Sequence, residues 1–201
     1  MLAPRLCWGC GGPARRAEPL CRFCRLGLRR LPAEPVPLAG VAVWAPVAYE
    51  GAARELVRAL KFRSAAGVAD AMAAQIVAGA PAGLLEGGAL VPVPLQPRRR
   101  RRRGFNQAFV LAERLAARAG LPVSDCLVRR GRGATQVGRG RAERRTGPSG
   151  TIAARTPPPA RALLVDDVAT TGATLAACAR ALRDAGASEV VALAFARTPG
   201  R

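Results

Sequence analysis

The sequence predicts an α/β protein with a parallel sheet flanked by helices, and a small four-cysteine module at its N-terminus. Segments with the character of strands alternate with segments of helical periodicity, which is the pattern of a parallel sheet that carries helices on both faces. Two Cys-x2-Cys pairs stand ahead of this alternation. The 201 residues, 50% of them hydrophobic, are enough for one ordinary domain and a small appendage.

The two cysteine pairs predict a structural zinc site. Each pair turns two thiolates toward one point, and two pairs supply the four sulfur ligands of a tetrahedral Zn²⁺ ion. A redox role is the competing interpretation, and the presence of two paired motifs makes it the weaker one. About 35 residues cannot form a core alone, so the metal would supply the folding free energy. We expect a zinc-binding module at residues 1–30 and a proline-punctuated linker at 31–37, with the ligands Cys7, Cys10, Cys21 and Cys24.

Each element of the expected main domain, residues 38–201, is predicted from its apolar pattern and its boundary residues. Apolar, β-prone runs predict strands, and Pro46 and Pro94 interrupt or end two of them. Apolar residues at helical spacing predict helices, with Gly120 and Gly186 as stops. The strands are expected at 41–49, 89–93, 127–129, 161–165 and 189–196. The helices are expected at 52–62, 66–77, 106–119 and from Thr170 or Thr171 to 185, whereas 130–160 shows no apolar period and is expected to be a loop.

The charge of the chain favours a negatively charged partner. The formal net charge is +19, and Lys61 is the only lysine among 32 basic residues. A chain this basic is expected to attract nucleic acid or phosphorylated small molecules, although a solvated basic surface explains the charge equally well. Lys61 ends an amphipathic stretch, and we expect it at the solvent-exposed surface more readily than in a site. The chain has no histidine, which excludes catalysis and metal ligation by imidazole.

No segment predicts export or membrane insertion. Residues 1–10 lack the long apolar run of a signal peptide. The most apolar window, at about 69–85, is interrupted by polar residues, glycine and proline. We therefore expect a cytoplasmic protein, in which paired cysteines bind metal before they form disulfides.

Residues 163–174 predict a site for a phosphorylated sugar. An apolar strand ends in Asp166 and Asp167, and a turn of small and hydroxylated residues leads into a helix. Ligands of open α/β sheets lie beyond the carboxyl ends of the strands. The two carboxylates can accept hydrogen bonds from a vicinal diol, and N–H groups at a helix N-terminus can surround a phosphate. This combination suits a ribose 5-phosphate, and the alternative is a solvated turn whose threonines only cap the helix.

Residues 91–107 predict a second anion site. The strand is followed by six consecutive arginines at 98–103, after which Gly104 is expected to open the next helix. Guanidinium groups bind phosphate oxygens, often through two hydrogen bonds. If this strand neighbours the strand that ends at Asp167, the two segments flank one site, with a monophosphate on one side and a pyrophosphate on the other. The alternative is a charge run that binds nucleic acid.

The two segments resemble known family motifs. Residues 163–174 resemble the signature of the type I phosphoribosyltransferases, which bind phosphoribosyl pyrophosphate (PRPP). Val-Pro-Val-Pro at 91–94 with Arg103-Gly-Phe-Asn-Gln at 103–107 resembles the competence-associated ComF family, a branch of that fold. The cysteine quartet, Tyr49-Glu-Gly with Leu60-Lys-Phe, and Thr135-Gln136 with a downstream arginine pair agree with it. The chain departs from the family pattern after Arg145, where Thr146 stands in place of a frequent asparagine.

The resemblance implies a PRPP-binding protein that displaces pyrophosphate from ribose C1 toward an unknown acceptor. It implies that Mg²⁺ accompanies PRPP, that Asp166 and Asp167 act on the ribose, and that 130–145 closes over the ligand. Two alternatives stay open. One is a DNA-uptake protein that binds single-stranded DNA, with the pocket as a non-catalytic PRPP or phosphate site, and the other is a PRPP-binding regulator. The oligomeric state also stays open. The expected ligand-binding residues are Ala169, Thr170, Thr171, Gly172, Ala173, Thr174, Arg98, Arg99 and Arg103.

Overall fold

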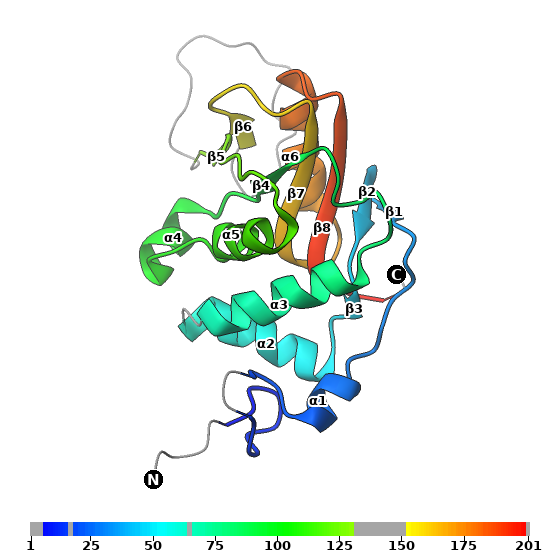
Figure 1. The fold of residues 1–201 in the computed structure, drawn as a ribbon. Coiled ribbons are helices and arrows are strands. Elements are labelled where there is room, and N and C mark those ends of the chain that lie inside the picture. The colour runs from blue at the N-terminus through cyan, green and yellow to red at the C-terminus, as the bar shows by residue number, and fades with distance from the viewer. Residues whose placement is uncertain (1–5, 16–17, 64–65, 131–151, 200–201) are drawn as a thin grey trace.

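The central feature of the fold is a six-stranded sheet in the order β1-β2-β8-β7-β4, with β3 paired to β8 (Figure 1). The structure is a computed structural model that describes residues 6–15, 18–63, 66–130 and 152–199. Within the sheet, β1 and β2 are antiparallel, and the other strand pairs are parallel. A separate antiparallel pair joins β5 and β6. The strands are β1 (Val36–Leu38), β2 (Val41–Trp44), β3 (Val47–Ala48), β4 (Ala89–Pro92), β5 (Leu127–Arg129), β6 (Ile152–Ala154), β7 (Arg161–Ala169) and β8 (Glu189–Arg197).

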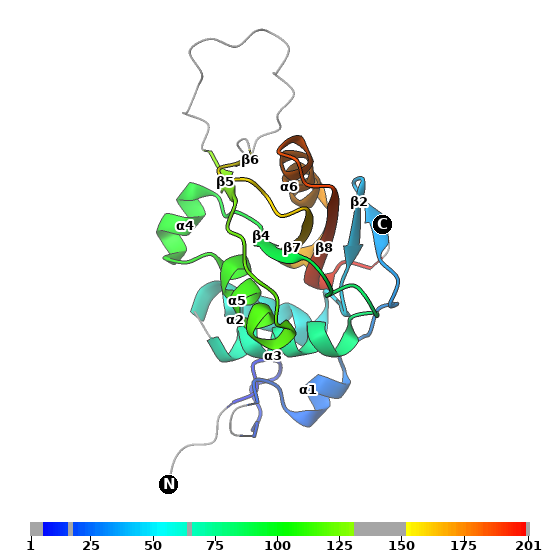
Figure 2. The same cartoon turned by 45° about the horizontal axis from the view of Figure 1, so that its top comes forward.

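Helices cover both faces of the sheet, which confirms the predicted fold class. Leu163 and Phe195 belong to the core between the sheet and the helices α2, α3 and α5. Leu164 and Ala192 belong to the core on the opposite face, beneath α6 and the β5-β6 pair. Figure 2 shows α2, α3 and α5 together on one side of the strands and α6 on the other. The helices are α1 (Arg22–Leu26), α2 (Gly51–Arg63), α3 (Ala66–Gly79), α4 (Pro97–Arg103), α5 (Gln107–Ala119) and α6 (Ala173–Asp184).

The helix boundaries follow local chemistry. Asn106 caps α5 by accepting a hydrogen bond from the N–H of Ala108 at 3.1 Å, and Gly120 ends the helix with φ 68°. The predicted strand at 41–49 is divided into β2 and β3, with Pro46 between them. Among the described residues, no helix is both long and apolar enough to cross a membrane.

The strand β7 is longer than the sequence predicts. It continues through Asp166 and Asp167 to Ala169, because β8 extends alongside it and pairs with Asp166 and Val168. Sheet pairing thus overrides the low β-propensity of aspartate. The N-cap of α6 is Gly172 and neither threonine; Thr171 Oγ1 accepts only a 3.4 Å hydrogen bond from the N–H of Ala173.

Two segments expected to be irregular form regular structure. Residues 98–103 lie in the helix α4, where Pro97 occupies the first turn and arginine is a good helix former. Gly104, with φ 79°, ends α4, so the expectation that it opens the next helix is wrong. Residues 152–154 form β6 inside the segment predicted as a loop. The expected motif at 135–136, the arginine pair at 144–145 and most of the expected lid lie outside the described residues.

The cysteine module packs onto the start of α2. Cys7, Leu20 and Leu28 share a core with residues of α2 and α3, and the N–H of Ala48 donates to the carbonyl oxygen of Arg29 at 2.9 Å. The expected linker is also tied to the sheet, since the N–H of Leu31 donates to the Pro46 oxygen at 3.0 Å. The division into residues 1–30, 31–37 and 38–201 stays a prediction.

Candidate functional site

The two predicted anion-binding segments meet at one edge of the sheet. β4 and β7 are parallel neighbours, with Pro92 opposite Val165, and the N–H of Val93 donates to the Val165 oxygen at 3.0 Å. The carboxyl ends of both strands therefore point the same way, and α4 begins where the acidic end of β7 lies. This confirms that the two strands neighbour each other, the condition for a shared site.

The two carboxylates lie on different faces of β7. Successive side chains of a strand point to opposite faces. Val165 belongs to the core beside α2 and α5, whereas Leu164 belongs to the core beneath α6. Asp167 therefore faces α2, and Asp166 faces α6. A ligand that contacts both carboxylates has to reach them past the carboxyl end of the strand.

Asp167 pairs with Lys61. Asp167 is 3% exposed, and its Oδ2 lies 3.1 Å from the Nζ of Lys61 on α2. The expectation that Lys61 is a solvent-exposed surface residue is therefore wrong, because its side chain is 24% exposed and reaches Asp167 from the last turn of α2. Among the described residues, the Asp167 Oδ2 atom is buried and makes this ion pair without a hydrogen bond.

The surroundings of Asp166 favour the neutral form of its carboxyl. Its Oδ1 accepts a hydrogen bond from the N–H of Asp167 at 2.8 Å. Desolvation raises the pKa of the Asp166 carboxyl well above its usual range, and the neighbouring Asp167 charge raises it further, whereas the backbone hydrogen bond and Lys61 oppose the rise. Such a carboxyl changes its charge readily when a cation or a hydroxyl donor arrives.

The arginines of α4 do not all face the carboxylates. Arg98 and Arg99 are exposed. Arg103 is half-buried, and its Nη1 donates to Gln107 Oε1 at 3.0 Å. Burial lowers the pKa of the Arg103 guanidinium, while the charge of Asp167 raises it. Among the arginines predicted to bind the ligand, Arg103 is therefore the one whose pKa is affected by the charge of Asp167.

The predicted phosphate loop is a tight turn between β7 and α6. Ala169 ends β7, and its oxygen accepts from the N–H of Thr198 at 3.0 Å. Gly172 has φ 74°, and a Cβ there would lie 2.7 Å from Leu38 Cγ, so both backbone and packing require glycine. Thr170, Thr171 and Ala173 are exposed, and Thr174 is half-buried in the first turn of α6. The six predicted residues thus form one turn at a helix N-terminus, where N–H groups point outward.

Sequence reasoning missed Arg129 as a site residue. It is the last residue of β5 and is half-buried. Burial lowers the pKa of its guanidinium, and the charge of Asp166 opposes this effect. Arg129 thus belongs to the electrostatic environment of Asp166. No local signal separates it from the other arginines, because only the packing of β5 over α6 brings it there.

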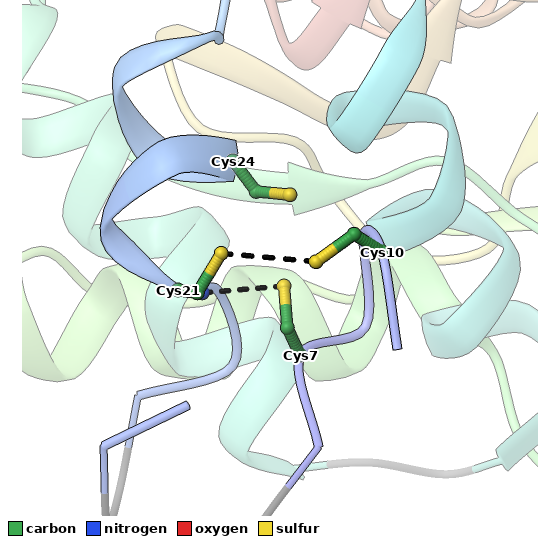
Figure 3. A group of neighbouring side chains, drawn as sticks. All are labelled: Cys7, Cys10, Cys21 and Cys24. Carbon is green, nitrogen blue, oxygen red and sulfur yellow. Dashed lines mark hydrogen bonds between the residues drawn. The ribbon is translucent and has the colours of Figure 1, made fainter. Parts of the chain in front are cut away.

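The four cysteines form a compact sulfur cluster (Figure 3). Their Sγ atoms all lie within 4.8 Å of one another, and Cys10 Sγ is 3.8 Å from Cys21 Sγ. A tetrahedron with Zn–S bonds of about 2.3 Å has sulfur atoms roughly 3.8 Å apart. The donor set and its spacing fit a structural metal ion such as zinc.

The polypeptide around the cluster favours the thiolate form of Cys7. Burial alone would raise the pKa of Cys7, but hydrogen bonds from the backbone N–H groups of Cys21, Cys10 and Gly9 outweigh it and lower this pKa to about 6. Burial and the other sulfurs raise the pKa of Cys24. Only glycine fits at position 9, because a Cβ there would lie 2.9 Å from Cys24 Sγ.

The chain is similar to known proteins over about half of its length. A family model described as phosphoribosyl transferase domain matches residues 106–201, from the cap of α5 through β7, α6 and β8. A curated relative, Competence protein F of Haemophilus influenzae, is 35% identical over 114 residues, which are 54% of this chain and 50% of that protein. The match thus spans about half the length of the curated relative. Lys61, α4 and the cysteine cluster lie outside the segment that the family model matches.

Proposed function

We propose that this chain belongs to the ComF family and that it binds PRPP at the carboxyl edge of β7. The match to the phosphoribosyl transferase domain and the similarity to Competence protein F support the family assignment. Asp166 and Asp167 hold the ribose hydroxyls. The turn at 169–174 holds the 5-phosphate. Arg103, with Arg98 and Arg99 at its outer side, receives the pyrophosphate.

One observation carries this proposal: a carboxylate pair in β7 leads directly into a glycine-locked turn at the start of α6. Asp167 is buried and retains an acceptor atom without a hydrogen-bond partner. The turn places the exposed Thr170 and Thr171 beside the N–H groups of a helix N-terminus. Diol acceptors and a phosphate cradle that follow each other so closely match the two ends of a ribose 5-phosphate.

The residues of the chain would act by position and charge. The carboxylates orient the ribose, and the guanidinium groups stabilise the negative charge that develops on a departing pyrophosphate. Mg²⁺ carried in with PRPP would neutralise part of the same charge. Transfer to an acceptor breaks the bond from ribose C1 to pyrophosphate and forms a bond from C1 to the acceptor. The acceptor is not identified by any group described above.

Calorimetric titration of PRPP with Mg²⁺ into the zinc-loaded protein tests the proposal. We expect saturable binding by the parent chain and its loss in the Asp166→Asn/Asp167→Asn double variant. The matched control is Asp70→Asn/Asp125→Asn, which removes two carboxylates that pair at the surface with Arg118 and Arg155. Equal binding by all three proteins would contradict the site, and no binding by the folded parent would contradict the function.

Single-stranded DNA binding is the second candidate. It is favoured by the net charge of +19 and by the exposed arginines of α4, and the name of the relative refers to competence. In this case affinity for an oligonucleotide should fall steeply with salt, because arginines release counterions from phosphates. Substituting Arg98 and Arg99 with Gln should weaken DNA binding and reduce the salt slope. If the same change left DNA affinity intact, α4 would not be the DNA surface.

A further inference from the structure

The ion pair between Lys61 and Asp167 differs from the surface ion pairs of this chain. Its side chains are 24% and 4% exposed, respectively. By contrast, both partners of the Arg118–Asp70 and Arg155–Asp125 pairs are at least 38% exposed. A buried carboxylate without a cation beside it is costly, whereas a solvated one is not. Lys61 therefore compensates the charge of a buried carboxylate inside the candidate site.

The type of residue at position 61 fits this role. Lys61 is the only lysine among 32 basic residues, although arginine serves in the surface pairs just described. An ammonium is a compact point charge with three donors, while a guanidinium is a wide planar fork. The ammonium approaches Asp167 Oδ2 to 3.1 Å without satisfying it as a hydrogen-bond acceptor. A compact ammonium can therefore pair with this buried oxygen from the last turn of α2.

The charges around Asp167 explain why a cation is needed there. Asp166 directly precedes Asp167 in β7, and a charge on one of these carboxyls opposes a charge on the other. The charge of Arg103, a half-buried residue of α4, also interacts with that of Asp167. α5 contributes Gln107, which is uncharged and accepts from Arg103. Lys61 is thus a cation in direct contact with the carboxylate, and it comes from a helix outside the segment that the family model matches.

We propose that Lys61 is a positioning residue of the PRPP site, which compensates the charge of Asp167 and orients its carboxylate toward the ribose hydroxyls. This inference rests on the proposed function. Lys61 acts through Asp167, so its contribution should vanish once Asp167 can no longer carry a charge. The conservative change to Arg retains the cation and should retain much of the affinity.

Calorimetry with PRPP and Mg²⁺ tests this role in a double-mutant cycle on the full, zinc-loaded chain. We expect Lys61→Met to weaken PRPP binding by about tenfold or more, the order found when one partner of a buried charge pair is removed. Lys61→Met should have no further effect in an Asp167→Asn background. Lys61→Arg should bind within a few-fold of the parent. The matched control is Arg58→Met, which removes the same charge one turn earlier on α2, from an exposed pair with Glu55.

The outcomes separate the two proposals. If the parent chain binds no PRPP, the proposed function fails, and the role of Lys61 fails with it. If the parent binds and Lys61→Met binds like Arg58→Met, only the role of Lys61 is overturned. Additive losses would also overturn it, because Lys61 would then contact the ligand independently of Asp167. If Lys61→Met folds poorly, two other comparisons decide the question. The first compares Lys61→Arg with the parent, and the second compares the Lys61→Met/Asp167→Asn chain with Asp167→Asn alone. No protein in these comparisons has a buried Asp167 carboxylate without a cation beside it.

Discussion

At the scale of single residues, the candidate site depends on positions where only one type of side chain fits the local structure. Gly172 shows this most directly, because it combines a positive φ with a contact to Leu38 that leaves no room for a Cβ. Asp166 and Asp167 are neighbours in sequence but differ in surroundings, since one lies under α6 and the other faces Lys61 of α2. The site therefore contains Asp167, which is paired with a cation, and Asp166, whose neutral carboxyl form is favoured.

The raised pKa of Asp166 predicts a pH-dependent cost to stability. A carboxyl with a folded-state pKa above its unfolded value, about 3.9, favours folding below that pH and loses this contribution as the pH rises through the folded pKa. Asp166→Asn removes the titration but keeps an oxygen for the N–H of Asp167. We expect the variant to gain stability relative to the parent as the pH rises from acidic to neutral, measured by urea unfolding across that window. A stability difference that does not change with pH would contradict this assignment.

At the scale of elements, short caps and pairings hold the two anion-binding segments at one sheet edge. Asn106 is central because it caps α5 through Ala108 and also donates its Nδ2 to the oxygen of Val93 at 3.1 Å. It thereby joins the end of β4 to the start of α5, on either side of the arginines of α4. The helix α4 itself is only seven residues long and ends at Gly104, so its position depends on these neighbours.

Substitution of Asn106 should therefore affect both stability and the site. We expect Asn106→Ala to lower the free energy of unfolding by about 1–2 kcal/mol, through loss of the cap and of the bond to Val93. Asn106→Asp keeps the cap acceptor but loses the donor, so it should fall between the parent and Asn106→Ala. Urea unfolding of the three proteins measures the order. Equal stability of the Asp and Ala variants would show that the cap contributes nothing.

At the scale of the whole molecule, the cysteine cluster and the candidate ligand site lie at opposite ends of α2. The cluster packs on the first turn, where Gly9 leaves space for Ala52, and Arg29 pairs with Glu50 at 2.8 Å. The last turn carries Lys61 to Asp167. A helix of 13 residues spans roughly 20 Å, so a rigid element connects the two sites.

Removal of the metal should therefore destabilise more than the N-terminal module. We expect a chelator to lower the melting temperature of the whole chain in one cooperative transition, because Cys7, Leu20 and Leu28 are part of the core around α2 and α3. Calorimetric melting with and without chelator, alongside measurement of released zinc, checks this. Restoration by added zinc is the control. Two independent transitions would instead favour separate units at 1–30 and 38–201.

The sequence by itself determined the parallel α/β architecture, the cysteine quartet, and the two segments that meet at the carboxyl edge of β4 and β7. These follow from local patterns: apolar periodicity, paired cysteines, and glycine and asparagine at helix ends. Only the tertiary structure decided that β7 continues through its two aspartates, that the arginines of α4 differ in exposure, and that Lys61 and Arg129 belong to the surroundings of the carboxylates. The physical reason is that burial and pairing depend on which elements pack together. A lysine at the end of an amphipathic helix looks solvent-exposed until the neighbouring strand is known.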